Sequence, residues 1–120
     1  GAWYSRIAVE VMQALESESP RNLIVNTANL GAIEGLPGDA SVEVPSMVSR
    51  EGVKPIMIGE VEEAIMGLIR QVKSYERLTI EAAIGRDKQK ALLALMANPL
   101  VGSAEQALKV LASIQKRGIL

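Results

Sequence analysis

The sequence contains neither cysteine nor histidine among its 120 residues. Without cysteine it can form no disulfide and offers no thiolate ligand or thiol nucleophile, which fits a reducing compartment. Without histidine it lacks the side chain best suited to proton transfer near neutral pH. A zinc site would need carboxylates alone, and a serine nucleophile would have no histidine to activate it. The groups left for chemistry are carboxylates, lysines and two tyrosines.

Aromatic side chains and excess charge are also scarce. The only aromatic residues are Trp3, Tyr4 and Tyr75, whereas sites for single-stranded nucleic acid or sugars usually stack their ligands on aromatic rings. The formal net charge is −1 and no basic stripe is present, which argues against a nucleic-acid partner. No apolar run reaches the roughly 18 residues that a membrane-spanning helix needs. We therefore expect neither nucleic acid nor membrane as a partner.

The start of the chain has no initiator methionine and no basic segment of the kind that opens a signal peptide. It begins inside an amphipathic pattern. We therefore expect the chain to be a piece of a longer protein, produced by proteolysis or by expression of that piece alone. A naturally short protein remains the alternative.

The hydrophobic content of 48% is enough to build a core. Helical periodicity over residues 4–17 predicts a first helix, which the polar run before Pro20 ends. Three short strands are predicted after it, because the segments are rich in β-branched residues or alternate with period two: Leu23–Asn26, Ser41–Pro45 and Lys54–Ile58. In the second strand we expect Val42 and Val44 to face the core, and Pro45 to mark a strand end or an edge.

The second half of the chain reads as helical. An apolar stripe over residues 60–84 predicts one long helix or two with a bend, capped by Gly85. Asp87 is placed to cap a helix over Lys88–Ala97, and Ser103 with Gln106 to open a last helix that ends near Gly118. Helix, strands and then helices predict a single domain over residues 1–120, of the α+β class, with a short, mostly antiparallel sheet and packed helices.

Few residues qualify as site candidates. Asn26 and Asn29 flank the point where the first strand leaves the core, and strand ends often hold ligand contacts; asparagines there also hold turns. Both alternatives stay open for these substrate-side candidates. The cluster of Glu60, Glu62 and Glu63 could bind a metal, but suits the first turn of a helix better. No catalytic, cofactor-binding or metal-binding residue is assigned.

Five stretches in order resemble the C-terminal region of glycoside hydrolase family 4, and within it the 6-phospho-β-glucosidases. The stretches match family patterns such as Gly-Ala-x-Tyr-Ser, Asn-Thr-x-Asn-x-Gly-x-Ile and Leu-Pro-x-Asp-x-x-Val-Glu-Val-Pro; they are Gly1–Ser5, Asn26–Ile33, Leu36–Pro45, Tyr75–Ala83 and Asn98–Val101. The similarity covers essentially the whole chain. It departs from the family at Ala28 and Leu30, where relatives often have an arginine and an asparagine, and this bears on any substrate-side role of the loop.

The resemblance implies an unusual hydrolase. In the family a bound NAD oxidises the sugar at C3, a divalent metal, typically manganese, acidifies the proton at C2, and a tyrosine removes it before the leaving group is eliminated. Ordinary glycosidases use a pair of carboxylates instead. Phosphorylated disaccharides are the implied substrates, and a bacterial cytoplasm the implied location.

For this chain the resemblance implies a structural and oligomerisation domain. The family's NAD loop, metal ligands and tyrosine base lie before the region covered, so no catalytic residue is carried over, and NAD and manganese are expected in the parent protein alone. The implied fold resembles the C-terminal domain of lactate and malate dehydrogenases. The implied partners are a missing N-terminal NAD-binding domain and further copies in a homo-oligomer. The alternatives are a domain of a family 4 α-glycosidase and a stand-alone, non-catalytic binding module.

Overall fold

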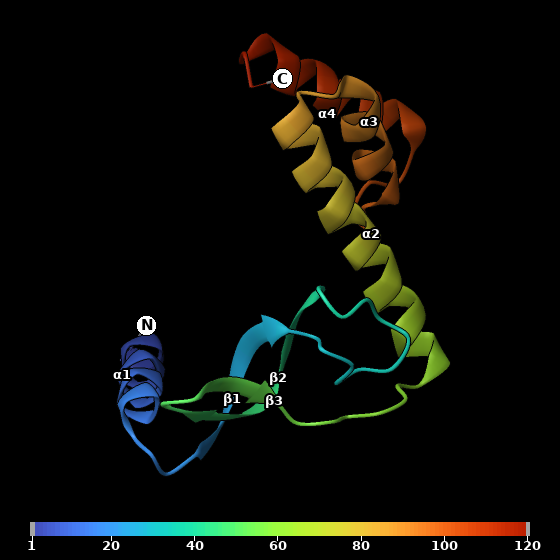
Figure 1. Ribbon diagram of the computed structural model, residues 1–120. Coiled ribbons are helices and arrows are strands. Elements are labelled where there is room, and N and C mark those ends of the chain that lie inside the picture. The colour runs from blue at the N-terminus through green and yellow to red at the C-terminus, as the bar shows by residue number, and fades with distance from the viewer. Residues whose placement is uncertain (1, 120) are drawn as a thin grey trace. The chain divides into compact units, whose positions relative to one another are not determined.

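The computed structural model describes residues 2–119 and contains four helices and three strands. It divides into two compact units, residues 1–61 and residues 62–120 (Figure 1). The first unit holds one helix and the sheet, and the second holds three helices. The predicted α+β class and antiparallel sheet are confirmed. That the 120 residues act as one domain stays a prediction.

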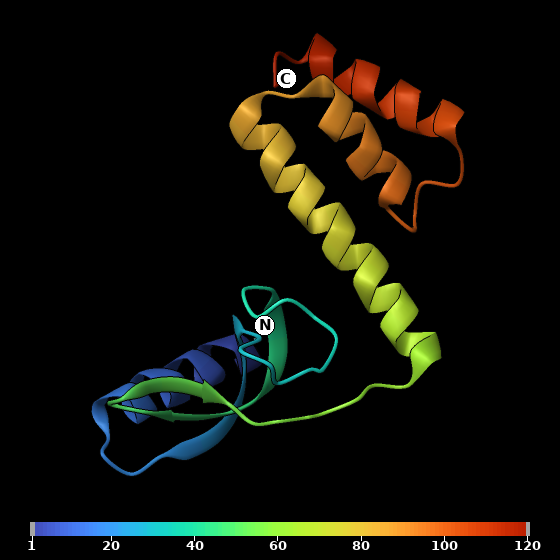
Figure 2. The same ribbon diagram turned by 45° about the vertical axis from the view of Figure 1, so that its right-hand side comes forward.

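The first unit is a helix followed by a three-stranded antiparallel sheet (Figure 2). Its elements, in order, are α1 (Ala2–Glu16), β1 (Arg21–Ala28), β2 (Ser41–Ser49) and β3 (Gly52–Pro55). The order in the sheet is β1-β2-β3, so β2 is central. Each strand pairs with its neighbour in sequence, as short connections favour.

One face of β2 supplies the core of the first unit. Val42, Val44 and Val48 are buried while Glu43 is exposed, which confirms the predicted alternation. Helix α1 packs against β2 and buries Ala14. Fully burying a valine side chain stabilises a fold by about 1.5–3 kcal/mol, so these three valines dominate the packing of the unit.

The prediction that Pro45 ends or edges its strand was wrong, because β2 continues to Ser49 as the central strand. Pro45 lies opposite Ile24 of β1, and its carbonyl oxygen accepts a hydrogen bond from the Ile56 N–H at 2.9 Å. In an antiparallel strand the N–H and C=O of a residue point to the same side. The nitrogen of Pro45 therefore faces β3 and the residues that follow it, and not β1. The pairing of β2 with β1 loses no hydrogen bond through the absence of an N–H at Pro45. The third strand also ends at Pro55 and not at Ile58 as predicted.

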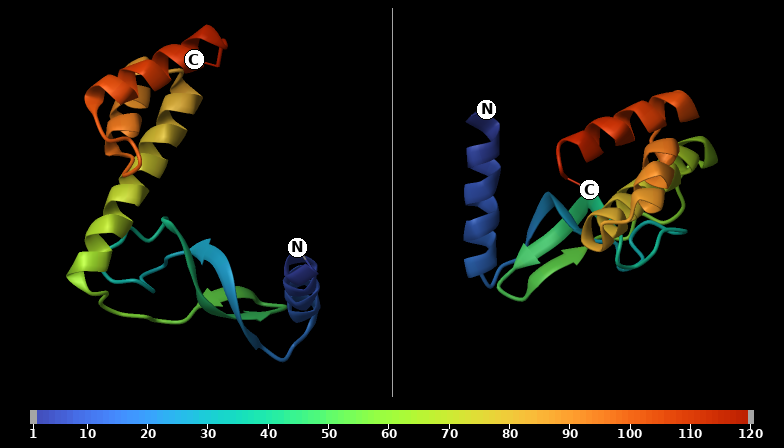
Figure 3. Two further views of the ribbon diagram at one scale, coloured as in Figure 1. Left: turned by 180° about the vertical axis from the view of Figure 1, so that it is seen from behind. Right: turned by 90° about the horizontal axis from the view of Figure 1, so that it is seen from above.

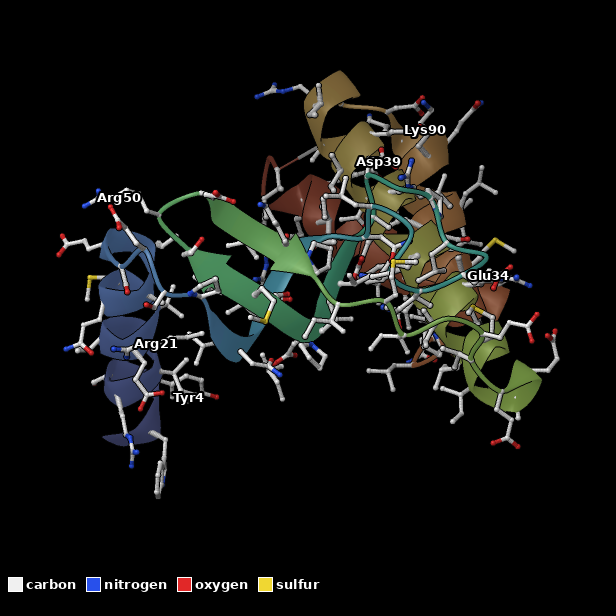
Figure 4. All side chains as sticks on the ribbon, turned by 60° about the horizontal axis from the view of Figure 1, so that its bottom comes forward. Tyr4, Arg21, Glu34, Asp39, Arg50 and Lys90 are labelled. Carbon is white, nitrogen blue, oxygen red and sulfur yellow. The ribbon has the colours of Figure 1, made fainter. Side chains whose placement is uncertain are left out.

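The turn between β2 and β3 is tied to the end of α1. The N–H of Arg50 donates to the Ser17 carbonyl at 2.8 Å, and its guanidinium donates to the Glu16 carbonyl and the Glu18 carboxylate, both at 3.4 Å. Figure 4 shows Arg50 beside this end of the helix. A cation at a helix C-terminus is favoured by the helix dipole, so Arg50 both fastens the turn and caps α1.

The second unit consists of α2 (Glu63–Gly85), α3 (Lys88–Ala97) and α4 (Ala104–Lys116). Of the two alternatives for the first of these helices, the structure shows one continuous helix of 23 residues. Helix α3 packs against both α2 and α4 (Figure 3). Its buried cluster is built from small side chains, Ala82 and Ala91 with Leu111, and Leu92 and Leu95 pack around it.

The helix ends follow the predicted caps in most respects. The Asp87 carboxylate accepts hydrogen bonds from the N–H groups of Gln89 and Lys90, and the Ser103 hydroxyl accepts one from Gln106. The predicted cap at Gly85 was wrong. Arg86 is the left-handed residue that ends α2, with φ of 49°, since Gly85 still belongs to the helix.

Candidate functional site

The candidate site residues lie around a loop at one end of the first unit, between β1 and β2. This loop covers residues 29–40, and the segment 56–59 after β3 is bonded to it. We call the two together the end loops. They contain one of the two predicted candidates, Asn29, and the Leu36–Pro37 stretch that carried the family resemblance, whereas Asn26 lies in β1.

The side chain of Asn29 holds the loop between β1 and β2 through hydrogen bonds to its backbone. This side chain is fully buried, at 0% exposure. The amide nitrogen donates to the carbonyls of Ile33 and Leu36 at 3.0 and 3.1 Å, and the amide oxygen accepts from the Ile33 N–H at 2.7 Å. Both amide hydrogens and the oxygen are therefore engaged within the loop, so the side chain of Asn29 holds the turn. A substrate-side role for Asn29 stays a prediction.

Asn26 lies in a different environment. It is exposed on β1, opposite Glu43 of β2. The structure thus places one candidate on the open face of the sheet and the other beneath the loop, and it does not bring their side chains into one site. A substrate-side role for Asn26 stays a prediction.

The contact between the two end loops was missed by sequence reasoning. The N–H groups of Ile58 and Gly59 both donate to the Ala32 carbonyl, at 2.8 and 3.1 Å, and the Glu34 N–H donates to the Gly59 carbonyl at 3.0 Å. This segment was predicted to be part of a strand. The available signal was Gly59, whose positive φ of 81° turns the chain out of strand geometry.

Leu30, one of the two positions where the sequence departs from the family pattern, has an unusual backbone conformation. Its φ is 47°, in the left-handed region, and 67% of the residue is exposed. Left-handed backbone costs a branched L-residue roughly 1–2 kcal/mol, and asparagine tolerates it far better. The end loops therefore hold an exposed leucine in a strained conformation next to the buried Asn29.

Two glutamates of α2 form ion pairs with lysines. Glu81 accepts from Lys90 at 2.6 Å and Glu76 from Lys73 at 2.7 Å. The hydrogen bond and charge of Glu81 raise the pKa of Lys90 above its ordinary value. Exposed pairs of this kind are typical of helix surfaces and contribute little to stability.

The structure bears out the first-turn placement for only one residue of the glutamate cluster. Glu63 lies in the first turn of α2, Glu62 is its N-terminal cap residue without a side-chain cap hydrogen bond, and Glu60 precedes the helix. Between residues 2 and 119, no group of three or more carboxylates is placed to hold a metal ion. The residues present in the described part therefore do not fit the manganese site that the resemblance implies for the parent protein.

No helix within residues 2–119 is both long enough and apolar enough to cross a membrane.

The sequence profile described as "Family 4 glycosyl hydrolase C-terminal domain" matches residues 2–101. Among curated proteins, the chain is 40% identical over 111 residues to the "Probable 6-phospho-beta-glucosidase" of Bacillus subtilis, covering 92% of this chain and 25% of that protein. It is also 40% identical over 114 residues to a 6-phospho-β-glucosidase of Thermotoga maritima, covering 95% of this chain and 28% of that protein. The chain therefore spans about a quarter of the length of these relatives.

Solved structures of family members are also similar to this chain. The Thermotoga maritima 6-phospho-β-glucosidase with NAD and glucose-6-phosphate matches with a TM-score of 0.90 at 38% identity, over 100% of this chain and 30% of that one. A 6-phospho-α-glucosidase from gut microorganisms, with NAD and Mn²⁺, also matches with a TM-score of 0.90, at 27% identity, over 96% of this chain and 26% of that one. Sequence profile, relatives and fold agree that the chain belongs to glycoside hydrolase family 4 and corresponds to its C-terminal domain.

Proposed function

We propose that this chain is the C-terminal structural and oligomerisation domain of a 6-phospho-β-glucosidase. The parent enzyme would hydrolyse phosphorylated glycosides in a bacterial cytoplasm by NAD-dependent oxidation and elimination, with a divalent metal such as manganese. One observation supports the β preference: identity is 40% to two 6-phospho-β-glucosidases and 34% to a third, whereas it is 34% to an α-galactosidase and 29% to a phospho-α-glucosidase. A parent with α specificity is the second candidate, because a 6-phospho-α-glucosidase shares the fold equally well.

The chain by itself is proposed to be inactive. It has no cysteine or histidine, and in its described part no carboxylates gather into a metal site. NAD and metal would be bound by the part of the parent that precedes this region. The role left to the chain is to pack against that part and against other copies.

Exposed apolar side chains on α1 support the packing role. Tyr4, Met12 and Leu15 lie on one side of α1 and are 82%, 58% and 41% exposed. Isolated exposed apolar residues are ordinary, but a contiguous patch usually marks a contact with another protein surface. We propose that this side of α1 meets the missing NAD-binding domain or a second copy of the chain.

The enzymatic proposal is tested by assaying the 120-residue chain and a longer protein that contains it, side by side. Each receives NAD, manganese, a thiol reductant and a chromogenic 6-phospho-β-glucoside, with the α-anomer as comparison. Turnover of the β-anomer by the longer protein alone is the expected result. Preference for the α-anomer would select the second candidate, and turnover by the 120-residue chain would overturn the structural role.

The packing proposal is tested on the chain alone by light scattering across a concentration series. We expect self-association, and we expect Tyr4→Gln with Leu15→Gln to weaken it. Val9→Gln is the matched control, because Val9 is also exposed but lies on another side of the helix. A monodisperse monomer at all concentrations would count against association through α1.

The stand-alone module is separated from a severed enzyme domain by the encoding gene. An upstream reading frame with a glycine-rich NAD loop and a cysteine-containing metal motif supports the enzyme domain. A start codon directly before Gly1 supports the module.

A further inference from the structure

The second unit contains a cavity, partly open to solvent, that the proposed function does not use. Its volume is about 250 Å³, and residues of α2, α3 and α4 line it. Helix α3 packs against both other helices, whereas the described residues of α2 and α4 pack little against each other. The cavity occupies the space between α2 and the end of α4, where Ile114 and Ile119 face it.

The walls of the cavity are short side chains that cannot fill it. Ala82, Ala91 and Ala94 form one side and are themselves 3%, 6% and 3% exposed. An alanine has no rotamer with which to close a gap, and moving the helices together would break the tight contact of α2 with α3. Because Thr79, Ala83 and Ile119 at its rim are exposed, the space is an open pocket that a small molecule can enter.

The chemistry of the lining selects the kind of occupant. Apolar cavities do not hold ordered water well, and a cavity of about 150 Å³ lined by aliphatic and aromatic side chains is known to accept benzene. Tyr75 presents an aromatic ring, and the nearby Thr79 presents a hydroxyl. The Thr79 hydroxyl donates its proton to the Tyr75 carbonyl at 2.8 Å, so its oxygen can only accept a further hydrogen bond.

We propose that this cavity binds a small aromatic molecule carrying one hydroxyl group, a phenol. The ring lies against the alanine wall and the Tyr75 ring, and the phenol hydroxyl donates to the Thr79 oxygen. Ala83 and Ile119 line the cavity and are exposed, so the ligand has a path from solvent. This inference is independent of the glycosidase proposal.

The test uses 4-fluorophenol and fluorobenzene as probes, with the 120-residue chain, followed by fluorine NMR. For wild type we expect saturable binding of 4-fluorophenol with a dissociation constant on the order of 1 mM or below. Ala83→Leu narrows the cavity from its exposed rim without a buried clash, and we expect it to weaken 4-fluorophenol at least about tenfold. Ala64→Leu is the matched control on the same helix, exposed and outside the cavity, and should leave binding unchanged.

A second variant examines the hydroxyl separately. Thr79→Val keeps the shape of the side chain and removes the acceptor, so binding of 4-fluorophenol should fall several-fold while that of fluorobenzene is unchanged or improved. Absence of saturable binding to wild type, or equal losses in Ala83→Leu and Ala64→Leu, would overturn the site. Equal effects of Thr79→Val on both probes would overturn the phenol assignment.

Discussion

The side-chain amide of Asn29 bonds both backbone groups of Ile33, accepting from its N–H at 2.7 Å and donating to its carbonyl at 3.0 Å. The side chain of Asn29 thus supplies hydrogen-bond partners for the N–H and the carbonyl of Ile33, as a neighbouring strand would do in a sheet. The second amide hydrogen reaches Leu36, so three backbone groups of the loop depend on one residue.

Asn29→Ala is therefore expected to lower the free energy of unfolding by about 2–4 kcal/mol, because buried backbone groups would lose their partners. The measurement is urea unfolding followed by circular dichroism. Asn26→Ala is the control, since Asn26 is exposed, and should change stability by less than about 0.5 kcal/mol. Similar losses in the two variants would mean that the amide of Asn29 is not what holds the loop.

Leu30→Asn is expected to raise the free energy of unfolding by about 0.5–1 kcal/mol, because asparagine tolerates the left-handed backbone that Leu30 adopts. Leu30→Ala keeps a Cβ in the same conformation and should bring no such gain. Thermal unfolding of the three proteins distinguishes them. A gain in the alanine variant would point to relief of apolar exposure and not to backbone strain.

Asp87→Ala removes the N-terminal cap of α3 and should cost about 1 kcal/mol, while Asp87→Asn, which can still accept the two backbone hydrogen bonds, should cost far less. Chemical denaturation monitored by the helical signal provides the comparison. If both variants lost the same amount, the carboxylate charge would matter more than the cap.

The ion pair of Glu51 with Lys54 makes a prediction about pH. The hydrogen bond and charge of Lys54 hold the pKa of the Glu51 carboxyl below its ordinary 4.5. The folded pKa lies below the unfolded one, so the contribution of the pair to stability is present above pH 4.5 and is lost as the pH falls through the folded pKa. Both side chains are exposed, so the effect is small and weakened by salt.

Lys54→Gln should return the Glu51 titration midpoint to its ordinary range, as followed by carboxyl-carbon NMR. Lys88→Gln changes the net charge equally but leaves the pair in place, and should leave the midpoint where it is. An unchanged midpoint in Lys54→Gln would show that the pair does not persist in solution.

The sequence predicted the helices well because their signals are local. The caps at Asp87 and Ser103 act within a few residues of the helix ends that they control, and the structure confirms them. Alternation in β2 likewise identified its buried face.

Features that depend on distant partners could not be predicted in the same way. The continuation of β2 beyond Pro45 depends on which neighbouring strand the missing N–H faces, and that is decided by pairing with β1 and β3. The contact of Ala32 with residues 58 and 59 depends on where β3 ends. For Asn29 the sequence left two roles open; its burial and its three hydrogen bonds show that it holds the turn, and these depend on the folded loop.

The hydrogen bonds of Asn29 all reach residues within eleven positions along the chain, to Ala40 at the farthest. Closing so short a segment costs little chain entropy, so this connection can form early in folding. Once closed, it places Ala28 beside Ser41, the first pair of the β1–β2 ladder. A shift of one position would turn every core valine of β2 outward, so closing the loop in this register fixes which face of β2 is buried. The same few hydrogen bonds that shape the end of the folded unit thus guide the chain toward its correct pairing.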